Sequence, residues 1–342
     1  MSGGGGSPAG RRFRVPAELD RARLDQALVG LLRAEAGAEA PSRGEVQRWV
    51  EAGRVLVDGR AAGKAGERVR AGAELWADPL PPPPSDARPD PGVSFRVVFE
   101  DEWLVVVDKP AGLVVHPSRG HPEGTLVNGL LARGPLAPDD ERDRGAEGLP
   151  RPGIVHRLDK GTSGLMVVAK KPRAREGLKA LFAAHDIERS YVAIAAGPTA
   201  AQTVSRPHGR HPTDRLRFTS RLPAGKRAVT HIEVLGRLAA GKATLVRCRL
   251  ETGRTHQIRV HLAEAAGTPV LGDPIYGRPP SDPRLRRLAE RLGRQALHAE
   301  VLGFVHPATG QSLRWTSAVP DDMAEALREL GGEVPAPPAA PR

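Results

Sequence analysis

Residues 153–170 read GIVHRLDKGTSGLMVVAK, and the interpretation of the whole chain starts from this stretch. One apolar segment leads into a loop with two glycines and a second apolar segment leaves it, which predicts strand, loop and strand, the first strand at 154–158. Side chains alternate between the faces of a strand, so Arg157 and Asp159 are expected on one face. An acid at a strand end, beside a flexible loop, is well placed to line a cleft. The structural alternative is that Asp159 caps the turn and Arg157 pairs with it.

Around this stretch the sequence predicts more strands than helices. Short apolar and β-branched runs predict strands at 93–99, 103–107, 165–169, 191–195, 231–235, 244–250, 297–305 and 313–315. Helical spacing predicts helices at 173–184, 256–266, 284–294 and 321–330. Thr255 is placed to cap the second of these helices. Because hairpin signals are frequent, we expect an α+β fold whose large domain has a mainly antiparallel, mixed sheet flanked by helices.

Two motifs that would indicate other chemistries are incomplete in this sequence. Residues 236–242 match the start of a phosphate-binding loop, but Ala243 stands where Ser or Thr must hold magnesium, and a strand pattern follows. We therefore interpret that segment as a hairpin turn. His256 and His261 diverge on a helix, which argues against a metal site.

Prolines mark the clearest internal boundary. They crowd residues 79–92, leave too few backbone donors for a helix or a central strand, and predict a semi-rigid linker. The predicted order is a disordered tail, a small α/β domain, the linker, a large domain and a second disordered tail, at residues 1–10, 11–78, 79–92, 93–330 and 331–342. Residues 135–150 are expected to form a long polar loop of undetermined role.

Composition narrows the function classes. The 342 residues carry a formal net charge of +11, which favours a polyanionic partner, with nucleic acid ahead of anionic lipid. A single cysteine, Cys248, excludes an internal disulfide and zinc sites built from several cysteines. No apolar run is long enough to span a membrane, and residues 1–10 lack the apolar core of a signal peptide. We expect a cytoplasmic protein that does not bind membranes.

The small domain carries basic residues beside two predicted helices that lead into a hairpin. Arg43 and Arg48 flank the second helix, and the hairpin turns at Asp58 and Gly59. Such a surface suits phosphates, although a charged helix face is more often simply solvated. Residues 11–78 resemble the S4 RNA-binding domain.

The large domain resembles the pseudouridine synthases of the RluA family, most closely its RluD-like members, which modify large-subunit ribosomal RNA. The matching segments are 107–112, 116–117, 156–170, 188–193, 225–231, 253–261 and 272–277. The resemblance implies that a uridine within RNA is isomerised: its N-glycosidic bond breaks, the base turns, and C5 rejoins the sugar. It also implies an isomerase that needs no metal or other cofactor, because no atom is gained or lost overall.

The resemblance assigns roles to four residues. Asp159 matches the catalytic aspartate, and whether it attacks the sugar, attacks the base or removes a sugar proton stays open. Arg259 matches the arginine that pairs with this acid, and a nearby cation keeps a carboxylate ionised. Tyr191 matches the active-site tyrosine, although a strand tyrosine is otherwise more often part of the core. Arg157 matches the arginine inserted where the flipped base leaves the stack. The family usually has an acid at the position of Gly161, which raises the question of how the loop is held.

Other residues are candidates for RNA contact. Residues 206–227 contain seven Lys or Arg and one acid, a composition that suits a loop following phosphates. The helix at 284–294 is also rich in arginine and serves either RNA or solvent. Together with Arg157, the candidate substrate-binding residues are His156, Lys160, Thr162, Arg210, Arg215, Arg254, His256, Arg43 and Arg48.

The sequence therefore predicts a monomeric RNA pseudouridine synthase that acts on 23S ribosomal RNA or a pre-50S particle. The alternatives are a sister synthase acting on another ribosomal site or a tRNA, a non-catalytic S4-type RNA-binding protein, and an RNA N-glycosidase that releases free base.

Overall fold

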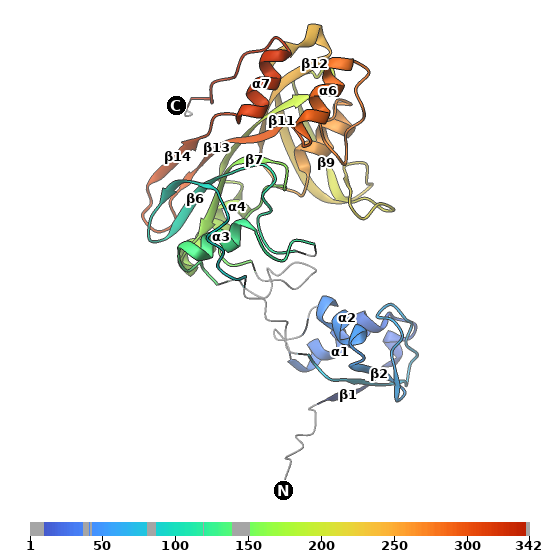
Figure 1. The fold of residues 1–342 in the computed structure, drawn as a ribbon. Coiled ribbons are helices and arrows are strands. Elements are labelled where there is room, and N and C mark those ends of the chain that lie inside the picture. The colour runs from blue at the N-terminus through green and yellow to red at the C-terminus, as the bar shows by residue number, and fades with distance from the viewer. Residues whose placement is uncertain are drawn as a thin grey trace. The chain divides into compact units, whose positions relative to one another are not determined.

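The computed structural model describes residues 10–36, 41, 43–80, 87–118, 120–138 and 151–339. The chain divides into two compact units, one formed mainly by residues up to 86 and the other mainly by residues from 87 onward. Figure 1 shows the elements of both.

In the first unit, two helices share a core with a four-stranded antiparallel sheet of strand order β1-β4-β2-β3. Its elements are β1 (Arg11–Arg14), α1 (Leu24–Ala36), α2 (Arg43–Glu51), β2 (Val55–Val57), β3 (Arg60–Ala61) and β4 (Glu74–Ala77). Leu24 and Leu28, one turn apart on α1, are fully buried together with Trp49 of α2 and Leu75 of β4.

The second unit is built on a ten-stranded sheet with the order β10-β9-β11-β12-β8-β13-β7-β6-β5, and β14 pairs with β13 off this path. The strands are β5 (Arg96–Glu100), β6 (Leu104–Lys109), β7 (Ser163–Ala169), β8 (Glu188–Ala195), β9 (Gln202–Arg210), β10 (Phe218–Thr219), β11 (Lys226–Leu238), β12 (Ala243–Leu250), β13 (Leu297–Val305) and β14 (Ser312–Thr316). The helices are α3 (Leu126–Arg133), α4 (Pro172–Ala184), α5 (Gln257–Val260), α6 (Pro283–Leu292) and α7 (Asp321–Glu329).

Helices cover both faces of this sheet. Alternate side chains of β6 divide between two cores, with Val105 on one side and Leu104 on the other. The larger core takes apolar side chains from α3, α5, α6 and α7. The smaller one takes Leu178 of α4. The sheet is therefore the middle layer of the unit (Figure 1).

The predicted fold class is confirmed. Every strand pair in the large sheet is antiparallel except β13 with β7, which run parallel at His298 and Ser163. The predicted hairpin turn is also confirmed, because β11 ends at Leu238 and its antiparallel partner β12 begins at Ala243.

Three local predictions are wrong. Residues 206–227 are not a single loop, because parts of this segment belong to β9, β10 and β11. Residues 154–158 form no strand: Ile154 makes one isolated bridge to Val168, and the His156 imidazole, rather than a strand carbonyl, accepts the Val167 N–H. Thr255 does not cap the next helix, since α5 begins after His256, whose backbone is left-handed with φ 58°.

The predicted linker and tails are only partly described. Residues 1–9, 81–86 and 340–342, and residues 139–150 of the predicted long loop, lie outside the described part of the chain. Residues 87–92 contact α3, where Asn128 donates to the Arg88 carbonyl. Near the C-terminus, Arg247 donates to the Ala336 carbonyl at 2.8 Å.

Candidate active site

Asp159 lies in the loop that leads into β7, where two cavities meet. One has a volume of about 660 Å³ and is also lined by Lys160 and Arg259. The other measures about 580 Å³ and is also lined by Tyr191 and Arg254. The Asp159 side chain is 20% exposed, so the carboxylate is held by protein on one side and open to a ligand on the other.

Arg259 of α5 holds this carboxylate. Its Nη1 donates to Asp159 Oδ2 at 2.8 Å, although the two residues are 100 positions apart in sequence. The guanidinium is almost fully buried and also makes a two-pronged ion pair with Asp273, at 2.7 and 2.8 Å. Burial opposes its charge, but the two carboxylates raise the pKa of Arg259 above its ordinary value. The site therefore contains a fixed cation aimed at one acid.

Asp273 is the anchor of this arrangement. Its side chain is fully buried and accepts the backbone N–H groups of Ile275 and Tyr276 as well as the Arg259 guanidinium. Although burial raises its pKa, the ion pair and hydrogen bonds together bring the pKa of Asp273 below its ordinary value. Asp273 thus fixes the direction in which Arg259 points.

His256 approaches Asp159 from the other side. Its Nε2 lies 3.7 Å from Asp159 Oδ1, and its Nδ1 lies 2.9 Å from the Tyr276 hydroxyl. That hydroxyl already accepts the Phe218 N–H, so its own proton is free to go to His256 Nδ1. Since burial lowers the pKa of His256, the neutral ring carries its proton on Nε2, facing the acid.

Tyr191 lies on β8, between Cys248 of β12 and Ala299 of β13. It is 8% exposed and shares two cavities with Asp159. Burial raises its pKa, so the group beside the acid is a neutral phenol. The ring is therefore both part of the core and part of the wall that faces a substrate.

Arg157 is exposed at the mouth of the site. Its Nη1 donates to His116 Nε2 at 2.9 Å, and the His116 Nδ1–H donates to the Pro117 carbonyl at 3.0 Å. Burial lowers the pKa of His116 to about 4, which keeps the ring neutral and able to accept this bond. His156 lines the cavity of about 580 Å³, and its ring also makes contacts within the protein, stacking on Phe182 with ring centroids 4.6 Å apart.

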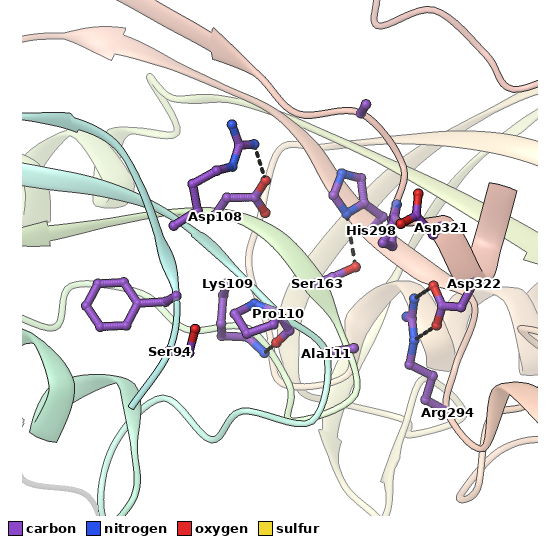
Figure 2. Close-up of a pocket in the computed structure, with 14 residues that line it drawn as sticks. Ser94, Asp108, Lys109, Pro110, Ala111, Ser163, Arg294, His298, Asp321 and Asp322 are labelled. Atoms are coloured by element: carbon purple, nitrogen blue, oxygen red, sulfur yellow. Dashed lines mark hydrogen bonds and ion pairs between the residues drawn. The ribbon is translucent and has the colours of Figure 1, made fainter. Parts of the chain in front are cut away.

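The loop after Asp159 is held by three side chains from distant elements. Lys109 Nζ donates to the carbonyls of Pro110 and Leu113, both at 2.9 Å, and to that of Lys160 at 3.3 Å. This lysine is fully buried, and burial lowers its pKa to about 7. It lines a cavity of about 720 Å³, whose lining side chains are drawn in Figure 2.

Arg294 and Gln295 complete this support. Arg294 pairs with Asp322 through two bonds of 2.7 and 2.8 Å (Figure 2) and donates to the Gly161 carbonyl at 3.1 Å. Gln295 Nε2 donates to Thr162 Oγ1, and its Oε1 lies 2.5 Å from where a Cβ on Gly161 would be. Although the family's usual acid is absent, the loop is braced by these contacts.

The remaining candidate RNA-contacting residues differ in how exposed their side chains are. Lys160, Arg210 and Arg215 are exposed, and Arg254 is half-buried in the wall of the cavity that contains Tyr191. Thr162 is buried and is used within the protein. In the first unit, Arg48 is half-buried on α2, and the Arg43 side chain lies outside the described part of the chain.

The sequence analysis gave no role to four residues that hold the site: Asp273, Tyr276, His116 and Lys109. All four lie inside segments that match the family, so a signal was present. Their partners are far away in sequence, with 41 positions between His116 and Arg157, for example, and no local pattern indicates such pairings. In the described ranges of the chain, no three His, Cys, Asp or Glu side chains are grouped so that they could hold a metal ion. None of the helices described is long and apolar enough to cross a membrane.

The buried histidines predict a pH-dependent stability. Burial lowers the pKa of His116 and of His261 to about 4, from 6.5. The unfolded chain then binds more protons than the folded chain below pH 6.5, so stability is lost as the pH falls. We expect the two residues together to lower the free energy of unfolding by roughly 2 kcal/mol between pH 7 and 5.5. Urea unfolding at both pH values measures this. His261→Asn should reduce the difference by about 1 kcal/mol and the exposed His185→Asn should keep it, whereas equal stability at both pH values would contradict the prediction.

Known proteins resemble the chain in both units. The family model for RNA pseudouridylate synthase matches residues 103–264, and the S4 domain model matches residues 39–75. Among solved structures, human RNA pseudouridylate synthase domain containing 4 aligns with a TM-score of 0.53 and 25% identity, over 70% of this chain and 95% of that one.

Curated relatives cover more of the chain. It is 42% identical over 317 residues to ribosomal large subunit pseudouridine synthase D of Nitrosomonas europaea, which spans 92% of this chain and 86% of that protein. The protein of the same name from Escherichia coli K12 is 40% identical over 315 residues, or 90% of each chain. An uncharacterized RNA pseudouridine synthase of Bacillus subtilis is 43% identical over 291 residues, 84% of this chain and 89% of that protein. Similarity of this degree along nearly the whole length, on a fold shared with solved synthases, shows that the chain belongs to the RNA pseudouridine synthases.

Proposed function

We propose that this enzyme isomerises uridine to pseudouridine in the ribosomal RNA of the large subunit, with Asp159 as its catalytic aspartate. The observation that carries the proposal is the Asp159–Arg259 pair, 2.8 Å apart, at the meeting point of two cavities whose walls include Arg157 and Arg254. The ribosomal target is supported by relatives named as large-subunit synthases at 40–42% identity.

The reaction conserves all atoms except one proton exchanged with water. The bond from N1 of the base to C1′ breaks, the uracil turns, C5 bonds to C1′, and the hydrogen on C5 leaves as N1 gains one. Asp159 acts as an anion, either as a nucleophile or as the base that starts the reaction, and Arg259 holds its carboxylate in position. Tyr191 offers a face for the uracil to stack on. Arg157 takes the place of the flipped base in the RNA stack.

Ribosomal RNA labelled with tritium at C5 of uridine tests this proposal. The enzyme should release the label to water from a 23S transcript or a pre-50S particle, while RNA length and base content stay unchanged. Release of free uracil would instead indicate an N-glycosidase, and absence of any release would indicate an RNA-binding protein without this activity. Faster release from tRNA than from 23S RNA would instead indicate a sister synthase that acts on tRNA. Mapping pseudouridines in cells with and without the gene then identifies the positions.

The proposal also covers the compartment in which the enzyme works and its oligomeric state. Its bacterial relatives are named for ribosomal RNA, so we place the activity in the cytoplasm, where that RNA is made. The first unit, which matches the S4 RNA-binding domain, supplies a second RNA-binding surface. Asp159, Tyr191 and Arg259 of one chain line a single cavity, so no second copy is needed to bring them together, and we expect a monomer. Sedimentation at working concentration measures this state, and an active species twice that mass would contradict it.

A further inference from the structure

Arg189 is a buried cation that the catalytic scheme does not use. It lies on β8, two positions before Tyr191, and strand alternation therefore puts both side chains on the same face. Only 6% of Arg189 is exposed. One of its nitrogens, Nη2, donates to the Glu251 carbonyl at 2.9 Å, and its guanidinium lies 5.3 Å from the Phe182 ring centroid.

The charge of this arginine has no carboxylate partner among the described residues. Its Nε is buried and makes no hydrogen bond in that part of the chain. The other buried arginines of the described chain are all paired with acids, and they are Arg175, Arg247, Arg259 and Arg294. Burial lowers the pKa of Arg189, and the nearby Arg254 lowers it further. A buried charge without a partner is costly, so this site lacks an anion.

The cavity of about 580 Å³ beside Asp159 gives an anion access to this charge. Arg189 lines it together with Arg157 and Arg254, so three guanidinium groups surround one space. Gly253 makes room for the buried one, since a Cβ there would lie 2.5 Å from Arg189 Nη1. Planar guanidinium groups suit phosphate oxygens, to which they can donate two bonds at once.

We propose that this cavity binds a phosphodiester group of the substrate RNA, one of the two that flank the target uridine, with Arg189 as its principal ligand and Arg254 at the rim. The inference rests on the proposed function, because it takes RNA as the ligand and Asp159 as the place of the target base. It adds a residue without an assigned role, and it explains why a cation is buried there without an acid.

Binding of a short RNA hairpin that contains the target uridine tests the site directly. The measurement uses full-length protein carrying Asp159→Asn, so that no turnover occurs. In that background Arg189→Gln should weaken binding about tenfold or more, and Arg189→Lys should weaken it less because the charge remains. The matched control is Arg173→Gln. Arg173 is exposed and lies at the start of α4, whereas Phe182 lies near the end of that helix, so this substitution should have little effect on binding.

RNA in which one phosphate is made neutral identifies the phosphate that contacts Arg189. Replacing each flanking phosphate in turn by a methylphosphonate should weaken binding to the arginine-containing protein at one position. At that position the same replacement should cost Arg189→Gln almost nothing, because the two changes remove one contact. Gly253→Ala displaces the Arg189 guanidinium without removing it. In this variant too, the methylphosphonate at that position should cost almost nothing. Purely additive effects at both positions would overturn the proposal.

The stability of the Arg189→Gln variant distinguishes an arginine that binds RNA from one that only supports the fold. Removing an unpaired buried charge should leave the urea midpoint of Arg189→Gln unchanged or raise it. A lower midpoint combined with unchanged RNA affinity would show that the role is structural and would overturn the proposal. Absence of tritium release by the unmodified enzyme would instead refute the proposed function, and the binding measurements would still decide the phosphate site.

Discussion

Asp159→Asn should abolish tritium release while RNA binding persists. Asparagine keeps the shape of the side chain, and its oxygen can still accept from Arg259, but it has no charge with which to act as nucleophile or base. The fold should survive, because Arg259 stays paired with the buried Asp273. Release of label from 23S RNA and equilibrium binding of the same RNA measure the two parts of this prediction.

The control for this variant is Asp321→Asn, which removes the same charge from an exposed position at the start of α7. It should release tritium at the normal rate. If Asp159→Asn also turned over normally, the catalytic role of Asp159 would be refuted. If it lost RNA binding together with turnover, the acid would be needed for the structure of the site rather than for chemistry.

Asp273→Asn should damage both rate and stability. It leaves the buried Arg259 with one carboxylate instead of two, and the new amide N–H groups face guanidinium donors. Breaking a buried ion pair costs about 3–5 kcal/mol. A guanidinium shifted by about 1 Å costs on the order of 100-fold in kcat, so we expect a loss of that size with a smaller change in KM.

Single-turnover tritium release at saturating enzyme measures the rate, and urea unfolding measures the stability. Asp321→Asn again serves as the matched exposed control. A variant that loses stability but keeps kcat would show that Asp273 supports the fold without orienting Arg259. Unchanged values of both would contradict the importance of the ion pair altogether.

The fold was largely predictable because its elements carry local patterns. The apolar runs of β7 and β13 and the helical spacing in α4 indicate those elements without any knowledge of partners. The failure at 154–158 has a local cause. There the His156 side chain satisfies the Val167 N–H, so an apolar stretch with alternation remains a loop. At α5 the helix start is set by the left-handed His256, which propensity does not favour.

The site was less predictable from spacing alone. Family resemblance picked out Asp159, Arg259 and Tyr191, and the structure brings them around the same cavities. The equal-face argument for Arg157 and Asp159 assumed a strand that does not exist. The supporting contacts of Asp273 and Lys109 join residues that are 14 and 51 positions apart, and no periodicity in the sequence indicates them.

The position of β13 has a consequence for how the enzyme is made. Among the described strands, β5, β6 and β7 are joined to β8 and those beyond it only through β13. Asp159 lies in the loop that leads into β7 and Tyr191 lies on β8, so the two sides of the active site belong to halves of the sheet that are joined by a later strand. A nascent chain emerges from its N-terminus, so residues 297–305 leave the ribosome after the strands β5 to β12 that they join. The growing polypeptide therefore joins the two sides of its active centre only after β13 has emerged, and a chain truncated before Leu297 leaves those halves unjoined.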